Sequence, residues 1–114
     1  MFKLIRDKIP NKIRDAGGVC NFATTENIEL YIDLLKSKLI EEVSEFLESG
    51  DIMELVDTLT VIKTYIKAIG YSEEDFDKLY KEKLKTNGGF EKRYIGFFPD
   101  PQPVQQPVQQ EEIR

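Results

Sequence analysis

Apolar residues recur at helical spacing through the middle of the 114-residue chain. The first stripe consists of Ile28, Ile32, Leu35, Leu39, Val43 and Phe46. Intervals of three and four residues place such side chains on one face of an α-helix. Thr24 or Thr25 can cap this helix at its start, and Ser49-Gly50 ends it. The pattern therefore predicts a long amphipathic helix that stops at this break.

A second helix is predicted directly after the break. Its apolar stripe consists of Ile52, Leu55, Leu59, Ile62, Ile66 and Ile69. Asp51 begins this helix, because Asp51 and Glu54 three residues later resemble a capping box, and Gly70 ends it. Since only a few residues connect the two helices, we expect them to form an antiparallel hairpin.

A third helix is predicted from about Glu73 to Thr86. Ser72 together with Asp75 can cap its start, and its apolar residues are Phe76, Leu79, Tyr80 and Leu84. The following segment, NGGFEKRYIGFF, indicates a turn and then a short extended or irregular stretch. The helical part of the chain therefore ends before this segment.

The two ends of the chain differ from its middle. Residues 1–20 form a basic arm with a short helix, in which Pro10 suits the first turn and Gly17-Gly18 ends the unit. Residues 21–98 hold the helical domain, and residues 99–114 form a Gln- and Pro-rich tail that we expect to be flexible. The chain is thus predicted to be an all-α bundle. Because a chain of this length has a shallow core, we expect self-association, as a homodimer or homotetramer, to complete the bundle.

Composition excludes several kinds of chemistry. The chain has no histidine and one cysteine, which excludes Ser-His-Asp and Cys-His catalysis, histidine-ligated zinc and an internal disulfide. No apolar run approaches the roughly 20 residues that cross a bilayer, so no membrane association is expected. The opening residues are too charged for a secretory signal, and we expect a cytoplasmic protein.

Negative charge is concentrated in one part of the chain. The formal net charge is −5, and residues 39–62 contain seven acids without a lysine or arginine. The rest of the chain has 16 basic residues against 14 acidic ones, a net charge of +2. This distribution favours a cation site over a nucleic-acid surface.

Four of these acids are placed to converge. Glu42 and Glu45 are three residues apart on one predicted helix, as are Glu54 and Asp57 on the next. In a hairpin centred on Ser49-Gly50, Glu42 should face Asp57 and Glu45 should face Glu54, at levels about 4.5 Å apart. No lysine or arginine in these stretches can neutralise them, so their repulsion favours bound Mg²⁺, with Mn²⁺ as a substitute. The alternative is a solvated acidic face, with Glu54 acting only as a capping residue.

Two acid motifs resemble a known family. EEVSE (41–45) followed by ELVD (54–57) is similar to the ExxE…ExxD signature of the MazG-like all-α nucleoside triphosphate pyrophosphohydrolases, which include phosphoribosyl-ATP pyrophosphohydrolases. KLIRDKIP (3–10) and GGFEKRYI (88–95) are similar to the ends of one MazG-like subgroup, so the resemblance covers residues 3 to 98. It implies an oligomeric helical bundle. It also implies Mg²⁺-dependent cleavage of a nucleoside triphosphate to a monophosphate and pyrophosphate.

The resemblance also implies roles for particular residues. Its metal ligands correspond to Glu42, Glu45, Glu54 and Asp57, and its catalytic acids to Glu41, Glu42 and Glu45. Glu41 would be an outer ligand or the base that orients water. The chain departs from the pattern at Thr60, where a further acid is expected, and at Asn87, where the subgroup often has arginine. These departures bear on the number of metal ions and on the contacts with phosphate.

Basic residues must hold the phosphates of such a substrate. The candidates are Arg6, Lys8, Lys38, Lys83, Lys92 and Arg93. For Lys38 the alternative is an ion pair with Glu42 one turn later, and for the others it is a role in solubility. The basic residues are scattered and lack interleaved aromatic residues, which argues against a nucleic-acid polymer as partner.

The sequence leaves two other functions open. One is hydrolysis of phosphoribosyl-ATP, within the same enzyme class. The other is a non-catalytic helical oligomer that binds metal structurally or presents its tail to a partner.

Overall fold

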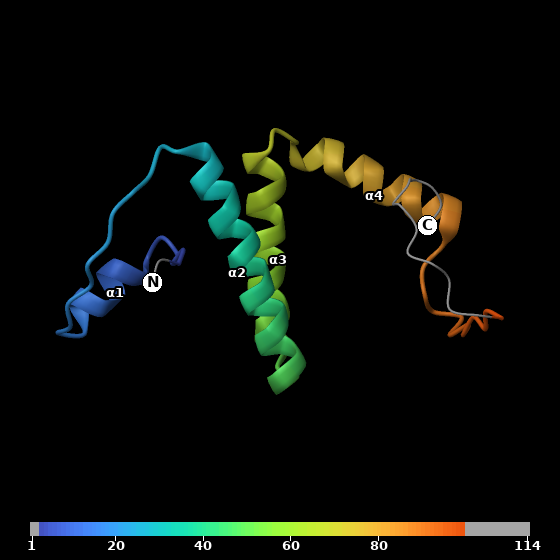
Figure 1. Cartoon of the computed structure of the whole chain (residues 1–114), viewed down its shortest axis with the longest axis horizontal. Helices are drawn as coiled ribbons and strands as arrows, with labels where there is room; N and C mark the ends of the chain where they lie inside the picture. Colours follow the sequence, from blue (N-terminus) through green and yellow to red (C-terminus); the bar gives the residue numbers. More distant parts are fainter. Residues whose placement is uncertain (1–2, 100–114) are drawn as a thin grey trace. The chain divides into compact units, whose positions relative to one another are not determined.

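The computed structural model describes residues 3–99, and within that range it contains four α-helices and no β-strand (Figure 1). The helices are α1 (Ile9–Asp15), α2 (Ile28–Ser49), α3 (Ile52–Ala68) and α4 (Glu73–Asn87). For this part of the chain, the all-α prediction is confirmed. The chain divides into two compact units, one ending at Glu82 and the other beginning at Lys83. The predicted tail, apart from residue 99, lies outside the described residues.

The arm forms its short helix where the sequence predicts it. Pro10 lies in the first turn of α1, where its missing N–H leaves no helical hydrogen bond unmade. Gly17 follows the helix with φ at +89°, and the N–H of Gly18 donates to the carbonyl of Ile13 at 2.9 Å. This left-handed turn ends the helix, as expected for Gly17-Gly18.

Helix α2 is capped by a residue that the sequence interpretation did not select. The prediction of Thr24 or Thr25 is wrong, because the side chain of Asn27 accepts a hydrogen bond from the N–H of Leu30 at 3.0 Å. Thr25 instead accepts from the N–H of Asn27 at 3.0 Å. Asparagine caps helices as well as serine or threonine does, and Asn27 directly precedes the first helical residue, which decides the choice.

The connection between α2 and α3 is short and well defined. Gly50 has φ at +68°, and its N–H donates to the carbonyl of Phe46 at 2.8 Å. Asp51 caps α3 by accepting from the N–H of Met53 at 2.9 Å, while its own N–H donates to Oγ of Ser49 at 3.1 Å. The predicted reciprocal capping box is therefore wrong, since Ser49 takes the contact expected of Glu54. The carboxylate of Glu54 remains available for other contacts.

The start of α4 and the end of α3 agree with prediction. Gly70 has φ at +103°, and the N–H of Tyr71 donates to the carbonyl of Ile66 at 2.9 Å, which closes α3. Oγ of Ser72 accepts from the N–H of Asp75 at 3.0 Å, which caps α4. Beyond Asn87 the described residues form turns and irregular structure, as predicted.

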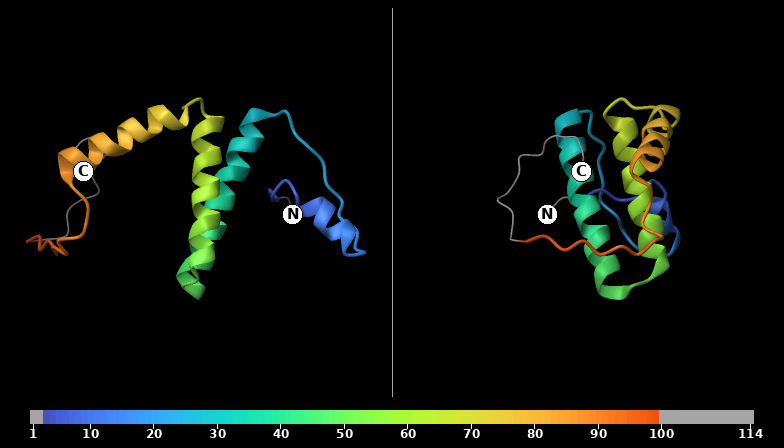
Figure 2. Two further views of the ribbon diagram at one scale, coloured as in Figure 1. Left: turned by 180° about the vertical axis from the view of Figure 1, so that it is seen from behind. Right: turned by 90° about the vertical axis from the view of Figure 1, so that its right-hand side faces the viewer.

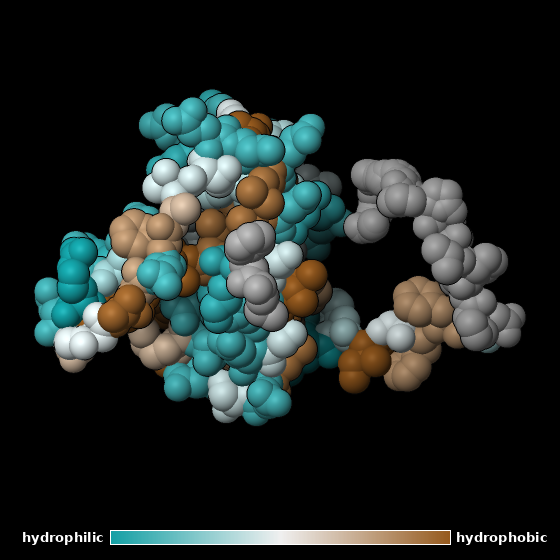
Figure 3. Space-filling view, turned by 60° about the vertical axis from the view of Figure 1, so that its left-hand side comes forward, coloured by the Kyte–Doolittle hydropathy of each residue, from teal (hydrophilic) through white to brown (hydrophobic). Residues whose placement is uncertain are grey.

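The core is shallow and lies between α2 and α3, which pack side by side (Figures 1 and 2). The buried side chains are Leu35, Val61, Ile66 and, among polar residues, Glu42, whereas α1 and α4 bury none. Many large apolar side chains remain open to solvent, and Figure 3 shows several on one face. Within residues 3–99, no helix is both long enough and apolar enough to cross a bilayer.

Candidate metal centre and adjoining pocket

The structure brings all five predicted acids together where α2 and α3 pack. Oxygens of Glu41, Glu42 and Glu45 lie within 4.8 Å of one another. A second group with the same spacing consists of Glu42, Glu54 and Asp57. Glu42 belongs to both groups and so lies at the centre of the cluster. This arrangement offers several carboxylate oxygens to one or two hard cations.

Glu42 is the most buried of these acids, with 6% of the residue exposed. Its Oε2 lies 3.4 Å from the ammonium nitrogen of Lys38, but its Oε1 is buried without any hydrogen-bond partner. A buried carboxylate oxygen that lacks a partner is costly, because it has lost its hydration without compensation. A divalent cation within the acid cluster would supply this partner. The donor set, which is entirely oxygen, fits Mg²⁺ or Mn²⁺.

Two of the acids have raised pKa values. Burial raises the pKa of Glu45, and the negative charges of Glu42, Glu54 and Glu41 raise it further. The pKa of Glu54 is also raised, by burial first and then by Glu42 and Asp57. Repulsion of this kind is what a bound cation relieves, because a cation favours the ionised carboxylate.

Glu41 behaves in the opposite way. Burial acts to raise its pKa, but the ammonium groups of Lys38 and Lys3 outweigh that effect and hold the pKa below its ordinary value. Both nitrogens lie 3.4 Å from Oε2 of Glu41. Two nearby ammonium groups therefore favour the ionised form of Glu41.

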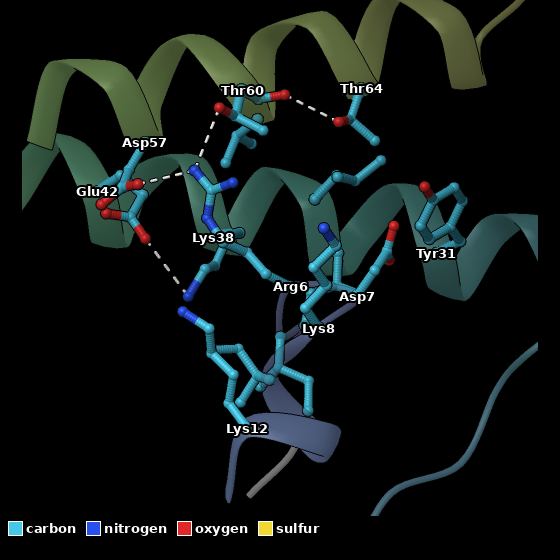
Figure 4. A pocket seen from close by; sticks show the side chains of 15 residues that line it. Arg6, Asp7, Lys8, Lys12, Tyr31, Lys38, Glu42, Asp57, Thr60 and Thr64 are labelled. Atoms are coloured by element: carbon cyan, nitrogen blue, oxygen red, sulfur yellow. Dashed lines mark hydrogen bonds and ion pairs between the residues drawn. The ribbon is translucent and has the colours of Figure 1, made fainter. Parts of the chain in front are cut away.

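Arg6 from the arm reaches the acid cluster directly. Its Nη2 donates to Oδ1 of Asp57 at 2.7 Å and to Oγ1 of Thr60 at 3.2 Å (Figure 4). The acid-rich stretches hold no lysine or arginine, but basic residues from outside them reach the acids, because Lys38 approaches from the preceding turn and Arg6 and Lys3 approach from the arm. Their contacts span sequence separations that a local pattern does not reveal. Thr60, at the position where an acid was expected, serves instead as a hydrogen-bond acceptor.

A pocket of about 490 Å³ adjoins the cluster (Figure 4). Glu42 and Asp57 lie at one end, and Tyr31 lies at the other end in Figure 4. Among the candidate phosphate-binding residues, Arg6, Lys8 and Lys38 line the pocket. Sequence reasoning missed Lys12 as a further basic residue of the lining. Apolar walls come from Leu4, Ile5, Ile9, Leu35 and Val61.

The remaining candidate phosphate-binding residues lie in the second compact unit. Lys83, Lys92 and Arg93 belong to the unit that begins at Lys83. There the ammonium of Lys92 lies 5.9 Å from the ring centroid of Tyr94, and Arg93 has φ at +61°. None of the three is among the residues that line the pocket beside Glu42 in the described part of the chain.

Comparisons of the chain with protein-family models, with curated proteins and with solved structures give no match. Any proposal of function therefore rests on the acid cluster, the pocket and the sequence motifs.

Proposed function

We propose that this chain is a Mg²⁺-dependent nucleotide pyrophosphohydrolase that cleaves a nucleoside triphosphate to a monophosphate and pyrophosphate. The observation that carries the proposal is the unpartnered, buried Oε1 of Glu42, which lies where two groups of carboxylates meet. The ExxE…ExxD motif resemblance supplies the reaction class. The adjoining pocket, with its basic and apolar lining, supplies a place for the substrate.

Glu42, Glu45, Glu54 and Asp57 are the residues that would hold the cation. When bound there, Mg²⁺ neutralises phosphate charge and lowers the pKa of coordinated water. Glu41 has a lowered pKa, so it is ionised near neutrality and can accept a hydrogen bond that orients water. None of these roles needs histidine, which the chain lacks.

The residues that line the pocket suggest an orientation for a bound nucleotide. Its phosphates would be near Glu42 and Asp57, where Arg6, Lys8 and Lys38 can donate hydrogen bonds. The nucleoside would extend toward Tyr31, whose ring offers a stacking surface beside apolar walls (Figure 4). Lys83, Lys92 and Arg93 stay predictions from the sequence alone.

We further propose that α2 and α3 form the antiparallel hairpin of a helical bundle that a second copy completes, as a dimer or tetramer. The support is the exposed apolar surface of α3 and α4. A second pocket of about 490 Å³ is lined there by Leu59, Phe76 and Tyr80 among others, and each of these three is at least 37% exposed. Burial of such side chains against another copy would be favourable.

The test is to incubate the full chain with a panel of nucleoside triphosphates and phosphoribosyl-ATP, with Mg²⁺ or Mn²⁺, and to measure pyrophosphate release. We expect release from at least one nucleotide, and its loss in Glu42→Gln but not in Glu48→Gln, an exposed acid outside both groups. Absence of release from every substrate would refute the proposed activity. Binding of Mn²⁺ without any hydrolysis would instead indicate a non-catalytic metal-binding protein.

A further inference from the structure

Arg6 contacts Asp57, which the candidate metal centre also needs as a ligand. Its Nη2 contacts Oδ1 of Asp57 at 2.7 Å, while an oxygen of Asp57 lies within 4.8 Å of oxygens of Glu42 and Glu54. A cation bound among these three acids and the guanidinium of Arg6 would therefore be close neighbours with like charge. Both depend on the same carboxylate.

The charges around the cluster show what a cation changes. Five carboxylates (Glu41, Glu42, Glu45, Glu54 and Asp57) face three basic side chains (Lys3, Arg6 and Lys38), which leaves two formal negative charges uncompensated. One divalent cation restores neutrality. Without Arg6 itself, the same groups carry a net charge of −3 before one divalent cation binds and −1 afterwards, so the attraction on the guanidinium falls and direct repulsion by the cation opposes it.

Arg6 is better able to leave than Lys38. The Arg6 side chain is 52% exposed, and it precedes α1, a helix with no buried residue. The Lys38 side chain is 18% exposed and belongs to α2, which forms the core. Arg6 also makes both of its contacts through one nitrogen, Nη2, so its other N–H groups stay available within the pocket that it lines.

We propose that Arg6 is an exchangeable counter-ion of the site. It pairs with Asp57 before a divalent cation binds, and it turns to the phosphates of the ligand when the cation takes Asp57. This inference rests on the proposed metal centre. It makes Arg6 a competitor of the metal alone and a partner of the metal with phosphate, so that the two ligands bind with positive coupling.

The experiment measures Mn²⁺ affinity of the full chain by calorimetry, first without and then with inorganic pyrophosphate as the phosphate probe. Arg6→Gln should bind Mn²⁺ alone roughly two- to fivefold more tightly, as expected for loss of a half-exposed ion pair. At saturating Mn²⁺, the same variant should bind pyrophosphate at least about fivefold more weakly. A merely structural role for Arg6 would not move the two affinities in opposite directions.

Arg14→Gln is the matched control. It removes the same charge from the same arm, but Arg14 contacts Asn11 within α1 and does not line the pocket. It should leave both affinities within about twofold of the wild-type values, since its charge acts only at a distance. Equal tightening of Mn²⁺ binding by Arg14→Gln would reduce the effect to net charge and overturn the proposal.

A second variant tests the contact without removing a charge. Thr60→Val deletes the other acceptor of Nη2 and should tighten Mn²⁺ binding in the same direction, by less than Arg6→Gln does. Unchanged or weaker Mn²⁺ binding in both variants, with Glu42→Gln still abolishing it, overturns the counter-ion role alone. No Mn²⁺ binding by the wild-type chain overturns the metal centre and this inference together.

Discussion

The ammonium nitrogen of Lys38 lies 3.4 Å from Oε2 of Glu42, one helical turn further along α2. Lys38 therefore satisfies one oxygen of the buried carboxylate and leaves Oε1 free for another partner. The same nitrogen lies 3.4 Å from Glu41, so one lysine serves two acids. Lys38 therefore forms the ion pair with Glu42 that was the alternative to a phosphate-binding role. Its positive charge also lines the pocket.

Replacing Lys38 should destabilise the chain in the absence of metal. Lys38→Gln leaves Glu42 buried without a counter-ion, and we expect the free energy of unfolding to fall by about 1–3 kcal/mol. Saturating Mn²⁺ should recover part of this loss, because the cation takes over the compensation. Urea unfolding with and without Mn²⁺ measures both effects. Lys36→Gln, an exposed lysine on the same helix, is the control and should change little; an equal loss in both variants would contradict the role of Lys38.

Glu42 is the position where loss of a carboxylate should matter most for metal binding. Glu42→Gln keeps the shape of the side chain but removes an ionised ligand common to both acid groups. Since even outer-shell partners of a metal change its affinity by about 10–100-fold, we expect Mn²⁺ affinity to fall by more than about 100-fold. Calorimetry with Mn²⁺ gives the affinity, and circular dichroism checks that helicity is retained. Retention of wild-type affinity would remove Glu42 from the ligand set.

The helices and the convergence of the acids were predictable because both depend on local information. The spacing of apolar residues predicted α2 and α3, and Ser49-Gly50 predicted the break between them. With the break known, Glu42 and Asp57 occupy matched positions on either side of it. Their oxygens do come within 4.8 Å in the structure.

The counter-ions were not predictable, because they come from distant segments. Arg6 and Asp57 are 51 residues apart, and their contact depends on how the arm folds back after α1. The local sequence pattern also gave wrong predictions where two residues could make the same capping hydrogen bond. Asn27 caps α2 in place of a threonine, and Ser49 accepts the hydrogen bond that a capping box would have assigned to Glu54. Spacing alone does not rank such competitors.

Stability in the absence of metal should depend on pH in a direction set by Glu45 and Glu54. Their pKa values are raised above the ordinary 4.5 in the folded chain, so folding favours their protonated forms. Their contribution is fully present below about pH 4.5 and is lost as pH rises through the raised values. Glu41, with a lowered pKa, contributes above 4.5 and loses its contribution as pH falls through the lowered value.

The comparison that isolates this effect is wild type against the Glu45→Gln, Glu54→Gln double variant. In the presence of a metal chelator, the wild-type free energy of unfolding should decline relative to that of the double variant as pH rises above about 4.5. With Mn²⁺ present the wild-type decline should shrink, because the cation stabilises the ionised acids. Urea unfolding at a series of pH values measures the difference. If the difference in the free energy of unfolding stayed constant across this pH range, the pKa values of these two carboxylates would not be raised by their surroundings.

Gly50 controls how α2 passes into α3. Its φ of +68° is unfavourable for residues with a side chain, although a Cβ would meet nothing within 4 Å. Gly50→Ala should therefore lower the free energy of unfolding by about 1–2 kcal/mol through backbone strain alone. Gly50→Asn should cost less, because asparagine tolerates the left-handed conformation better. Equal losses for the two variants in thermal unfolding would point to a cause other than this conformation.

Self-association should depend on the apolar face of α4. Tyr80 is 58% exposed and lines the pocket beside α3, so Tyr80→Glu places a charge where we propose that a second copy packs. We expect the dissociation constant of the oligomer to rise at least about tenfold, the loss expected when one buried large apolar contact is removed. Sedimentation velocity over a concentration series measures the shift. Lys78→Gln changes the net charge equally on another face of the same helix and should leave the distribution unchanged. A wild-type chain that is monomeric at every concentration would contradict the proposed self-association.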